Sequence, residues 1–250
     1  MNMQASDLSA RLLATENLSV IRANARTASF DIKSRVLTLP MWKEMSPEIE
    51  DMLIGHEVGH ALYTGDEYLK PIEENRKLMG YMNIIEDVRI EKLIKRKYPG
   101  LRKRMNEGYK QLNERDFFGV KSVQDFSDLL LIDRINLYFK VGFQCGVKFT
   151  PEEKQFVNRA ERCETVDEVT LLAKDIYDIY EAIFGENGIE KELEQEDGLL
   201  DRTKNLNRYQ DVDLADDLFR QKIYDSFIKL LDKNVIADKN LIVKYAKDFF

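Results

Sequence analysis

His56-Glu57-Val58-Gly59-His60 is the most informative segment of this sequence. Both histidines of the 250 residues lie in these five positions. Residues four apart project from the same face of a helix, so the spacing predicts two imidazoles that bind one zinc ion. Glu57 lies between the two predicted ligands, where it is placed to take a proton from a metal-bound water molecule.

Start and stop signals of a helix flank this motif. Ser46 is a favourable N-cap, Pro47 suits the first helical position, and Gly65 marks the end. Gly55 and Gly59 lower the helix propensity of the segment, so each is expected to permit the close approach of a neighbouring backbone.

The rest of the chain is expected to be mainly α with a small N-terminal β-hairpin or sheet, an α+β fold. The strand signal is Val36 to Leu39, which follows a polar turn and ends at Pro40; it predicts the second strand of a hairpin whose edge could hold an extended peptide. Helices are predicted in the first twenty residues and at about 73–97, 101–114, 125–143, 151–163 with Thr150 as cap, 167–184, 214–231 and 235–249.

Composition narrows the classes of protein to which the chain can belong. A formal net charge of -7 argues against a general nucleic-acid binder. No apolar run has transmembrane length and the N-terminus lacks a signal-peptide pattern, so a cytoplasmic protein without membrane contact is expected. Cys145 and Cys163 form no C-x-x-C motif and are predicted to be reduced packing residues rather than a disulfide.

The segment from Lys92 to Arg104 reverses the charge balance, with seven basic residues and no acid. Such a run can contact nucleic acid or an acidic partner. It is also typical of a solvated helix end, where the helix dipole favours cations. The second interpretation is favoured because only Tyr98 could serve as an aromatic platform for bases.

A catalytic zinc site needs a third protein ligand and leaves its fourth position to water. The chain has no further histidine, so a carboxylate is expected. Glu86 is the predicted ligand because a carboxylate in an apolar stripe needs a cation; Asp87 and Glu91 fall on the opposite side of the helix. The alternative is an ion pair between Glu86 and Arg89, and both arrangements can hold together. The stripe consists of Met79, Met82, Ile85, Ile90 and Leu93.

An H-E-x-x-H helix followed by a glutamate ligand from a later helix resembles the gluzincin metallopeptidases, the thermolysin-like class. His56 to Thr64 (HEVGHALYT) and Asn83 to Glu91 (NIIEDVRIE) are similar to metallopeptidase domains of large tailed phages, which often occur with a von Willebrand A-type domain. This similarity covers about residues 8–143. It implies a zincin-like metal-binding domain over 1–145, a helical region over 146–250 with an acidic linker or loop at about 186–213, and synthesis in the infected bacterial cytoplasm.

The chain departs from that pattern at three places. Thermolysin-like enzymes have an aspartate four residues after the ligand glutamate, and here that position is Ile90. They also use a downstream histidine to stabilise the oxyanion, which this chain lacks; Tyr63, Tyr81, Tyr109 and Arg89 remain as alternatives. Residues 125–127 begin like the metal motif of a von Willebrand A-type domain, but Leu129 breaks it.

The sequence therefore predicts a zinc-dependent peptide-bond hydrolase, a metalloendopeptidase acting on a peptide or protein substrate. His56, His60 and Glu86 are the expected metal ligands, and Glu57 is the expected general base. The alternative is a catalytically idle, zinc-containing phage protein that binds a host or virion partner. The presence of Glu57 favours the enzyme, because a purely structural metal does not need that acid. The missing orienting aspartate and oxyanion histidine favour the alternative.

Overall fold

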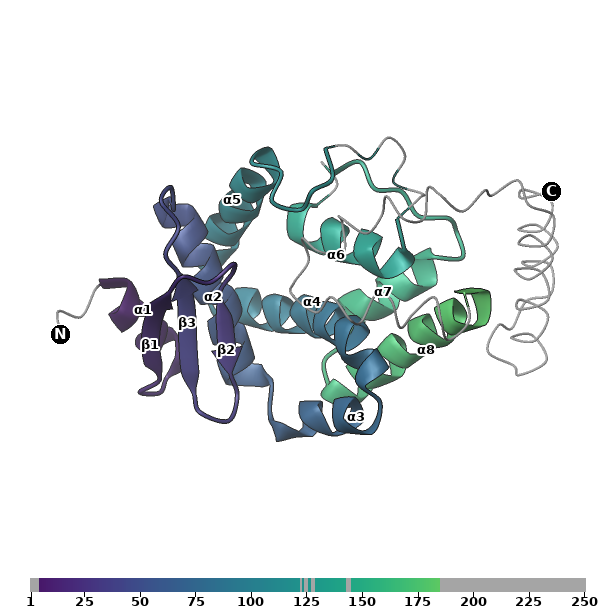
Figure 1. Cartoon of the computed structure of the whole chain (residues 1–250), viewed down its shortest axis with the longest axis horizontal. Coiled ribbons are helices and arrows are strands. Elements are labelled where there is room, and N and C mark those ends of the chain that lie inside the picture. The colour runs from purple at the N-terminus through teal and green to yellow at the C-terminus, as the bar shows by residue number, and fades with distance from the viewer. Residues whose placement is uncertain (1–4, 122, 124–125, 127–128, 143–144, 185–250) are drawn as a thin grey trace.

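The computed structural model describes residues 5–121, 123, 126, 129–142 and 145–184. These residues are mainly helical with one small sheet, as the sequence predicted (Figure 1). The acidic segment at 186–213 and the helices predicted at 214–231 and 235–249 lie outside the described residues. The longer elements are α1 (Ala5–Ala14), β1 (Ser19–Ala23), β2 (Ser29–Asp31), β3 (Val36–Pro40), α2 (Pro47–Tyr63), α3 (Leu69–Glu74), α4 (Met79–Lys97), α5 (Leu101–Glu114), α6 (Leu131–Val141), α7 (Lys154–Arg162) and α8 (Val166–Phe184).

The three strands form one sheet in the order β1-β3-β2. Strands β2 and β3 are antiparallel, with Phe30 opposite Leu37, which confirms the predicted hairpin. Strand β1 was not predicted; it pairs parallel with β3, with Ser19 opposite Val36. Strand β3 is therefore central and both of its edges are paired. The expectation that this strand offers an edge to an extended peptide is wrong.

Helix α2 forms as its sequence signals predicted. It begins at Pro47, and the Ser46 hydroxyl accepts a hydrogen bond from the Ile49 N–H at 3.2 Å. A Cβ atom at Gly59 would lie 2.7 Å from Cδ1 of Ile90, so glycine at this position permits α4 to approach α2 closely. At Gly55 the nearest atom would be 3.5 Å away, an ordinary contact. The expected close approach of a neighbouring element is thus found at Gly59 and not at Gly55.

The helix predicted at 73–97 is divided in the structure. Helix α3 ends at Glu74, a short 3-10 turn (Arg76–Leu78) follows, and α4 begins at Met79. The interruption lies at Asn75, whose backbone is extended and whose side chain accepts a hydrogen bond from the Lys77 N–H at 3.1 Å. A short polar side chain that bonds the nearby backbone competes with helix continuation, which explains the break.

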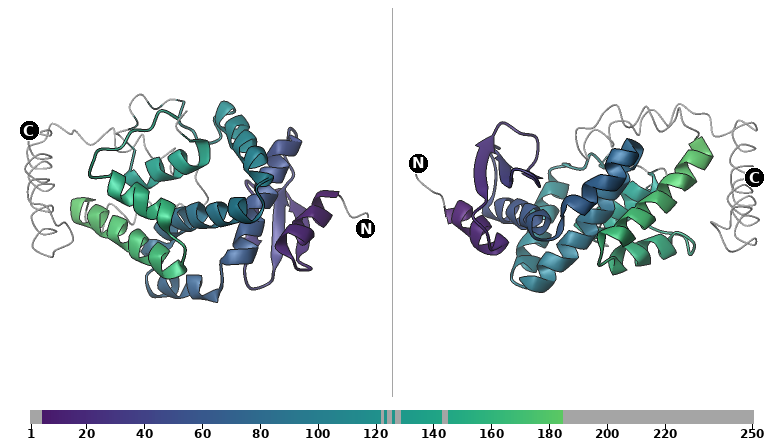
Figure 2. Two further views of the ribbon diagram at one scale, coloured as in Figure 1. Left: turned by 180° about the vertical axis from the view of Figure 1, so that it is seen from behind. Right: turned by 90° about the horizontal axis from the view of Figure 1, so that it is seen from below.

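Helix α4 contributes residues to two hydrophobic clusters. Its ribbon runs beside that of α8 (Figure 2). One cluster joins α4 to α6, α7 and α8, with Met82, Ile85 and Ile176 fully buried. The other joins the sheet, α1, α2 and α5, and includes Ile94 near the end of α4. Helices α7 and α8 follow residue 145, so the first cluster spans the boundary that the sequence suggested and α4 packs against helices from both regions.

Two further expectations from composition concern the cysteines and membrane contact. Cys145 and Cys163 are buried free cysteines, as predicted. No helix among the described residues is both long enough and apolar enough to span a bilayer.

Candidate metal centre

Helix α2 carries both histidines of the motif. His56 and His60 lie one turn apart on the same helix, with ring centroids 5.0 Å apart, and their side chains are 13% and 19% exposed. Both rings are therefore largely shielded, yet still reachable by a small ion.

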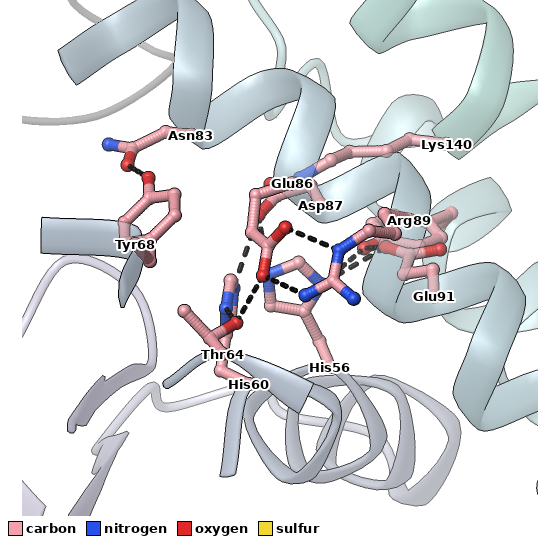
Figure 3. Close-up of polar contacts among 11 residues, drawn as sticks. His56, His60, Thr64, Tyr68, Asn83, Glu86, Asp87, Arg89, Glu91 and Lys140 are labelled. Atoms are coloured by element: carbon pink, nitrogen blue, oxygen red, sulfur yellow. Dashed lines mark hydrogen bonds and ion pairs between the residues drawn. The ribbon is translucent and has the colours of Figure 1, made fainter. Parts of the chain in front are cut away.

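Helix α4 contributes a carboxylate that meets both rings (Figure 3). The Asp87 Oδ1 atom lies 3.5 Å from His56 Nε2 and 3.2 Å from His60 Nε2. These three residues form a group whose ligand atoms all lie within 4.8 Å of one another. Two ligand atoms at about 2.0–2.1 Å from a tetrahedral zinc ion would be separated by roughly 3.3–3.4 Å. The donor set and its spacing therefore fit zinc, with the fourth position left open.

The ring of His56 is oriented by a second acid of α4. Glu91 Oε1 lies 3.0 Å from His56 Nδ1 and also accepts a hydrogen bond from the Tyr109 hydroxyl, while its Oε2 accepts one from Lys95 at 2.6 Å. Burial raises the pKa of the Glu91 carboxyl, but Lys95 and His56 outweigh burial and hold that pKa far below its usual range. An ionised carboxylate only accepts, so His56 carries a proton on Nδ1, and Nε2 is the nitrogen that faces Asp87.

The ring of His60 is oriented through a hydroxyl. Its Nδ1 lies 3.0 Å from Thr64 Oγ1, and the Thr64 hydroxyl donates to Glu86 Oε1 at 2.5 Å. Because Thr64 has one proton and gives it to the carboxylate, its oxygen must accept from His60 Nδ1. Both histidines thus carry a proton on Nδ1 and turn Nε2 toward Asp87, so an ion would bind at Nε2 and displace any proton there.

Glu86 itself lies in a closed ion pair. Its side chain is fully buried, and Arg89 donates to its Oε2 at 2.7 Å and its Oε1 at 2.6 Å. The same arginine donates to the backbone carbonyls of Tyr63 and Glu164. The alternative that the sequence left open, an ion pair of Glu86 with Arg89, is therefore present.

In this geometry the carboxylate that lies beside both imidazoles is Asp87 and not the predicted ligand Glu86. The sequence argument assumed one buried stripe on α4, but the helix packs against α2, α6, α7 and α8, and burial at one position does not identify the neighbour that it faces. Four residues after Asp87 stands Glu91, which contacts His56.

Lys140 of α6 joins the site and was not predicted. Its Nζ lies 2.8 Å from Asp87 Oδ2. Burial alone would raise the pKa of the Asp87 carboxyl, but Lys140 and the two histidines hold it well below its usual range. Asp87 is thereby kept in the ionised form that binds a cation. The same network acts on His56: burial lowers its pKa, but Asp87 and Glu91 raise it to about 10 in the metal-free protein.

Glu57 is buried beside the two histidines, with 5% of the residue exposed. Burial raises the pKa of its carboxyl, although His56 and His60 lower it in part. Burial of a carboxylate costs free energy unless a cation or a hydrogen-bond donor compensates it. The place of Glu57 next to the predicted ligands is consistent with a general base.

The four residues considered as oxyanion stabilisers are placed differently. Arg89 is bound to Glu86, and its guanidinium also reaches the Tyr63 carbonyl. Tyr81 is buried against Tyr177, with ring centroids 5.6 Å apart. Tyr109 lies 3.4 Å from His56 Nδ1 and donates to Glu91, whereas Arg89 is linked to His60 through Glu86 and Thr64.

Much of the basic run at 92–104 is engaged within the protein. Lys92 and Arg96 pair with Glu164, at 3.0 and 2.8 Å. Lys95 pairs with Glu91, and Arg104 with Glu48 at 3.2 Å. Lys95, Arg96 and Lys97 lie in the last turn of α4, as the interpretation of a solvated helix end expects, whereas residues 102–104 lie in the first turn of α5.

No model of a known protein family, no curated protein and no solved structure matches the chain.

Proposed function

We propose that this chain is a zinc-dependent peptide-bond hydrolase with a zincin-like core, made in the bacterial cytoplasm like the phage domains that its motif resembles. The observation that carries the proposal is the convergence of His56 Nε2, His60 Nε2 and Asp87 Oδ1 beside the buried carboxylate of Glu57. Three N and O donors with an open fourth position are typical of a catalytic rather than a structural zinc site.

His56, His60 and Asp87 would hold the metal. When bound, zinc would supply a Lewis acid that acidifies water and polarises a scissile carbonyl. Glu57 would take the proton from the attacking water and pass it to the leaving amine. Glu91 and Thr64 hold the two imidazoles in the tautomer and direction that this reaction needs, through contacts of 3.0 Å each.

The test is metal content together with cleavage of a peptide library by wild type, Glu57→Gln and Glu73→Gln. Elemental analysis for zinc, iron and manganese should find about one zinc ion per chain in all three proteins. Glu57→Gln keeps the size of the side chain but removes the base, so it should lose turnover by about 10²- to 10⁴-fold. Glu73 is an exposed acid of α3, and its variant should cleave like wild type.

Two outcomes would contradict the proposal. One is a wild-type protein that holds zinc and cleaves no peptide of the library, while Glu57→Gln leaves its biological phenotype intact. That result would support the idle, partner-binding alternative. The other is a protein that purifies without zinc and does not take it up.

A further inference from the structure

A pocket of about 230 Å³ lies between α4, α6 and α7 and shares Asp87 with the candidate metal centre. Its apolar walls are Val88 and Phe139, and the rest of its lining is polar or charged. Pockets for drug-sized ligands usually span about 300–1,000 Å³. This pocket therefore has room for about one residue of a chain rather than for a large ligand.

Helix α6 presents two polar side chains to this pocket. Asn136 and Lys140 are four residues apart, so they lie on one face of the helix. Asn136 is 3% exposed, and its Oδ1 atom has no hydrogen-bond partner in the described part of the chain. A buried amide oxygen without a partner costs free energy, and such groups in folded proteins call for an explanation.

Lys140 has unused hydrogen-bonding capacity. Its ammonium group has three donors, and within the described residues its one hydrogen-bond acceptor is Asp87. Of the other two lysines of the pocket, Lys92 donates to the backbone carbonyls of Glu161 and Cys163, and Lys95, like Lys140, has one acceptor, Glu91, within the described residues. Lys140 differs from Lys95 because it lies one turn from Asn136 on the same face of α6. Lys140 is thus the cation of this pocket that can contact a ligand together with Asn136.

These observations define the chemistry of the occupant. Asn136 Oδ1 needs an N–H donor, Lys140 needs an oxygen acceptor, and the apolar walls suit a short aliphatic side chain. A peptide unit carries the donor and the acceptor together. We propose that the pocket is a subsite for one small residue of a peptide, whose carbonyl oxygen accepts from Lys140 and whose N–H donates to Asn136. Only the description of this peptide as a substrate rests on the proposed function.

The experiment is an NMR titration of the ¹⁵N-labelled protein with N-acetyl-alanine N-methylamide. This probe is uncharged and contains a single residue, and its binding does not require peptidase activity. Wild type should show saturable shifts confined to residues 87–95 and 136–140, in metal-free and zinc-loaded protein alike. Lys140→Met and Asn136→Leu should each weaken binding at least tenfold, whereas Lys140→Arg keeps a donor cation and should retain binding. The exposed Lys110 and Asn158 provide matched controls, and Lys110→Met and Asn158→Leu should bind like wild type.

The proposal is overturned if wild type shows no saturable shifts around the pocket, or if Lys140→Met and Asn136→Leu proteins that keep the wild-type fold by NMR bind the probe equally well. If one of these variants does not fold, the other decides, because each removes one of the two hydrogen bonds proposed for the probe. If neither folds, the position of the shifts in wild type decides, because binding outside the pocket overturns the proposal. Metal content and cleavage of the same samples separate the two proposals. A protein that binds the probe without holding zinc supports the subsite and contradicts the hydrolase, and a zinc-containing, active protein that does not bind the probe does the reverse.

Discussion

The two sides of helix α4 hold buried carboxylates in different ways. On one side, Glu86 and Arg89 form a closed pair within the helix, with side-chain exposures of 0% and 5%. On the other side, Asp87 and Glu91 are 16% and 6% exposed, and both contact histidines of α2. Asp87 is also paired with Lys140 of α6, and Glu91 is also paired with Lys95 of α4. Adjacent positions in sequence, Glu86 and Asp87, therefore lie in separate environments.

The difference shows which carboxylate has capacity for an ion. Glu86 receives hydrogen bonds from Arg89 and Thr64 on both oxygens, so binding a metal would first require breaking an internal pair. Asp87 has Lys140 on one oxygen and two imidazole Nε2 atoms near the other. An ion bound here would replace the contacts of 3.5 and 3.2 Å between Asp87 Oδ1 and the two Nε2 atoms, and no internal pair of Glu86 would have to break. The first side should thus serve stability and the second side chemistry.

The largest expected effect is on stability, from Glu86→Gln. Removing one partner of a buried pair leaves Arg89 as an uncompensated buried charge, so the free energy of unfolding should fall by about 3 kcal/mol or more. Chemical denaturation of the metal-free protein measures this change.

The matched control is Glu48→Gln, which removes the partner of Arg104 in a pair whose side chains are 33% and 49% exposed. Exposed pairs contribute about 0–1 kcal/mol, so the control should change little. Equal losses in the two variants would mean that the pair on α4 is not the closed, stabilising element that its burial indicates.

The second effect is on metal binding, from Asp87→Asn. Loss of a direct ligand should weaken zinc affinity by more than about 100-fold, the upper end for outer partners of metal ligands. Zinc at 1,000 times its dissociation constant stabilises a folded protein by about 4 kcal/mol, so a chelator should lower the melting temperature of wild type far more than that of the variant.

Asp51→Asn, on an exposed part of α2, should bind zinc like wild type. The decisive comparison is with Glu86→Gln under conditions where that variant is folded. If Glu86→Gln lost the metal and Asp87→Asn kept it, the assignment of roles to the two sides of α4 would have to be reversed.

Local signals in the sequence were sufficient for α2 and the motif. The cap at Ser46, Pro47 at the first turn and the spacing of His56 and His60 all depend on neighbours within a few residues. The identity of the third candidate ligand depends on which side of α4 faces α2, and the packing of α4 against four other helices sets this orientation. A pattern of apolar residues indicates that one side of a helix is buried, but it does not indicate which element that side contacts. A usable signal was present, because Asp87 and Glu91 are acids four residues apart in the segment after the motif.

Lys140 and Asn136 could not be predicted for a different reason. They lie more than 45 residues beyond Asp87 in the chain, and nothing in their local sequence distinguishes them from solvated residues of an amphipathic helix. Their place beside the metal centre follows from the packing of α6 on α4. Strand β1 was missed likewise, because its parallel pairing with β3 is a non-local contact.

The smallest effect tests the one link between the two sides, Thr64. Its hydroxyl donates to Glu86 and accepts from His60, so this oxygen links the closed ion pair to the candidate metal centre. Thr64→Val keeps the shape of the side chain but removes the hydroxyl, and zinc affinity should fall by about 10- to 100-fold, as for other outer partners of metal ligands. Thr64→Ser restores the hydroxyl and should restore the affinity.

A purely structural role of Thr64 would lower stability without altering the tautomer of His60, so the ¹⁵N shifts of His60 provide the separate measurement. They should report a proton on Nδ1 in wild type and Thr64→Ser, and a mixture of tautomers in Thr64→Val. If Thr64→Val bound zinc like wild type with the Nδ1 proton unchanged, the two sides of α4 would be independent, and Glu86 and Arg89 would have no part in positioning the metal ligands.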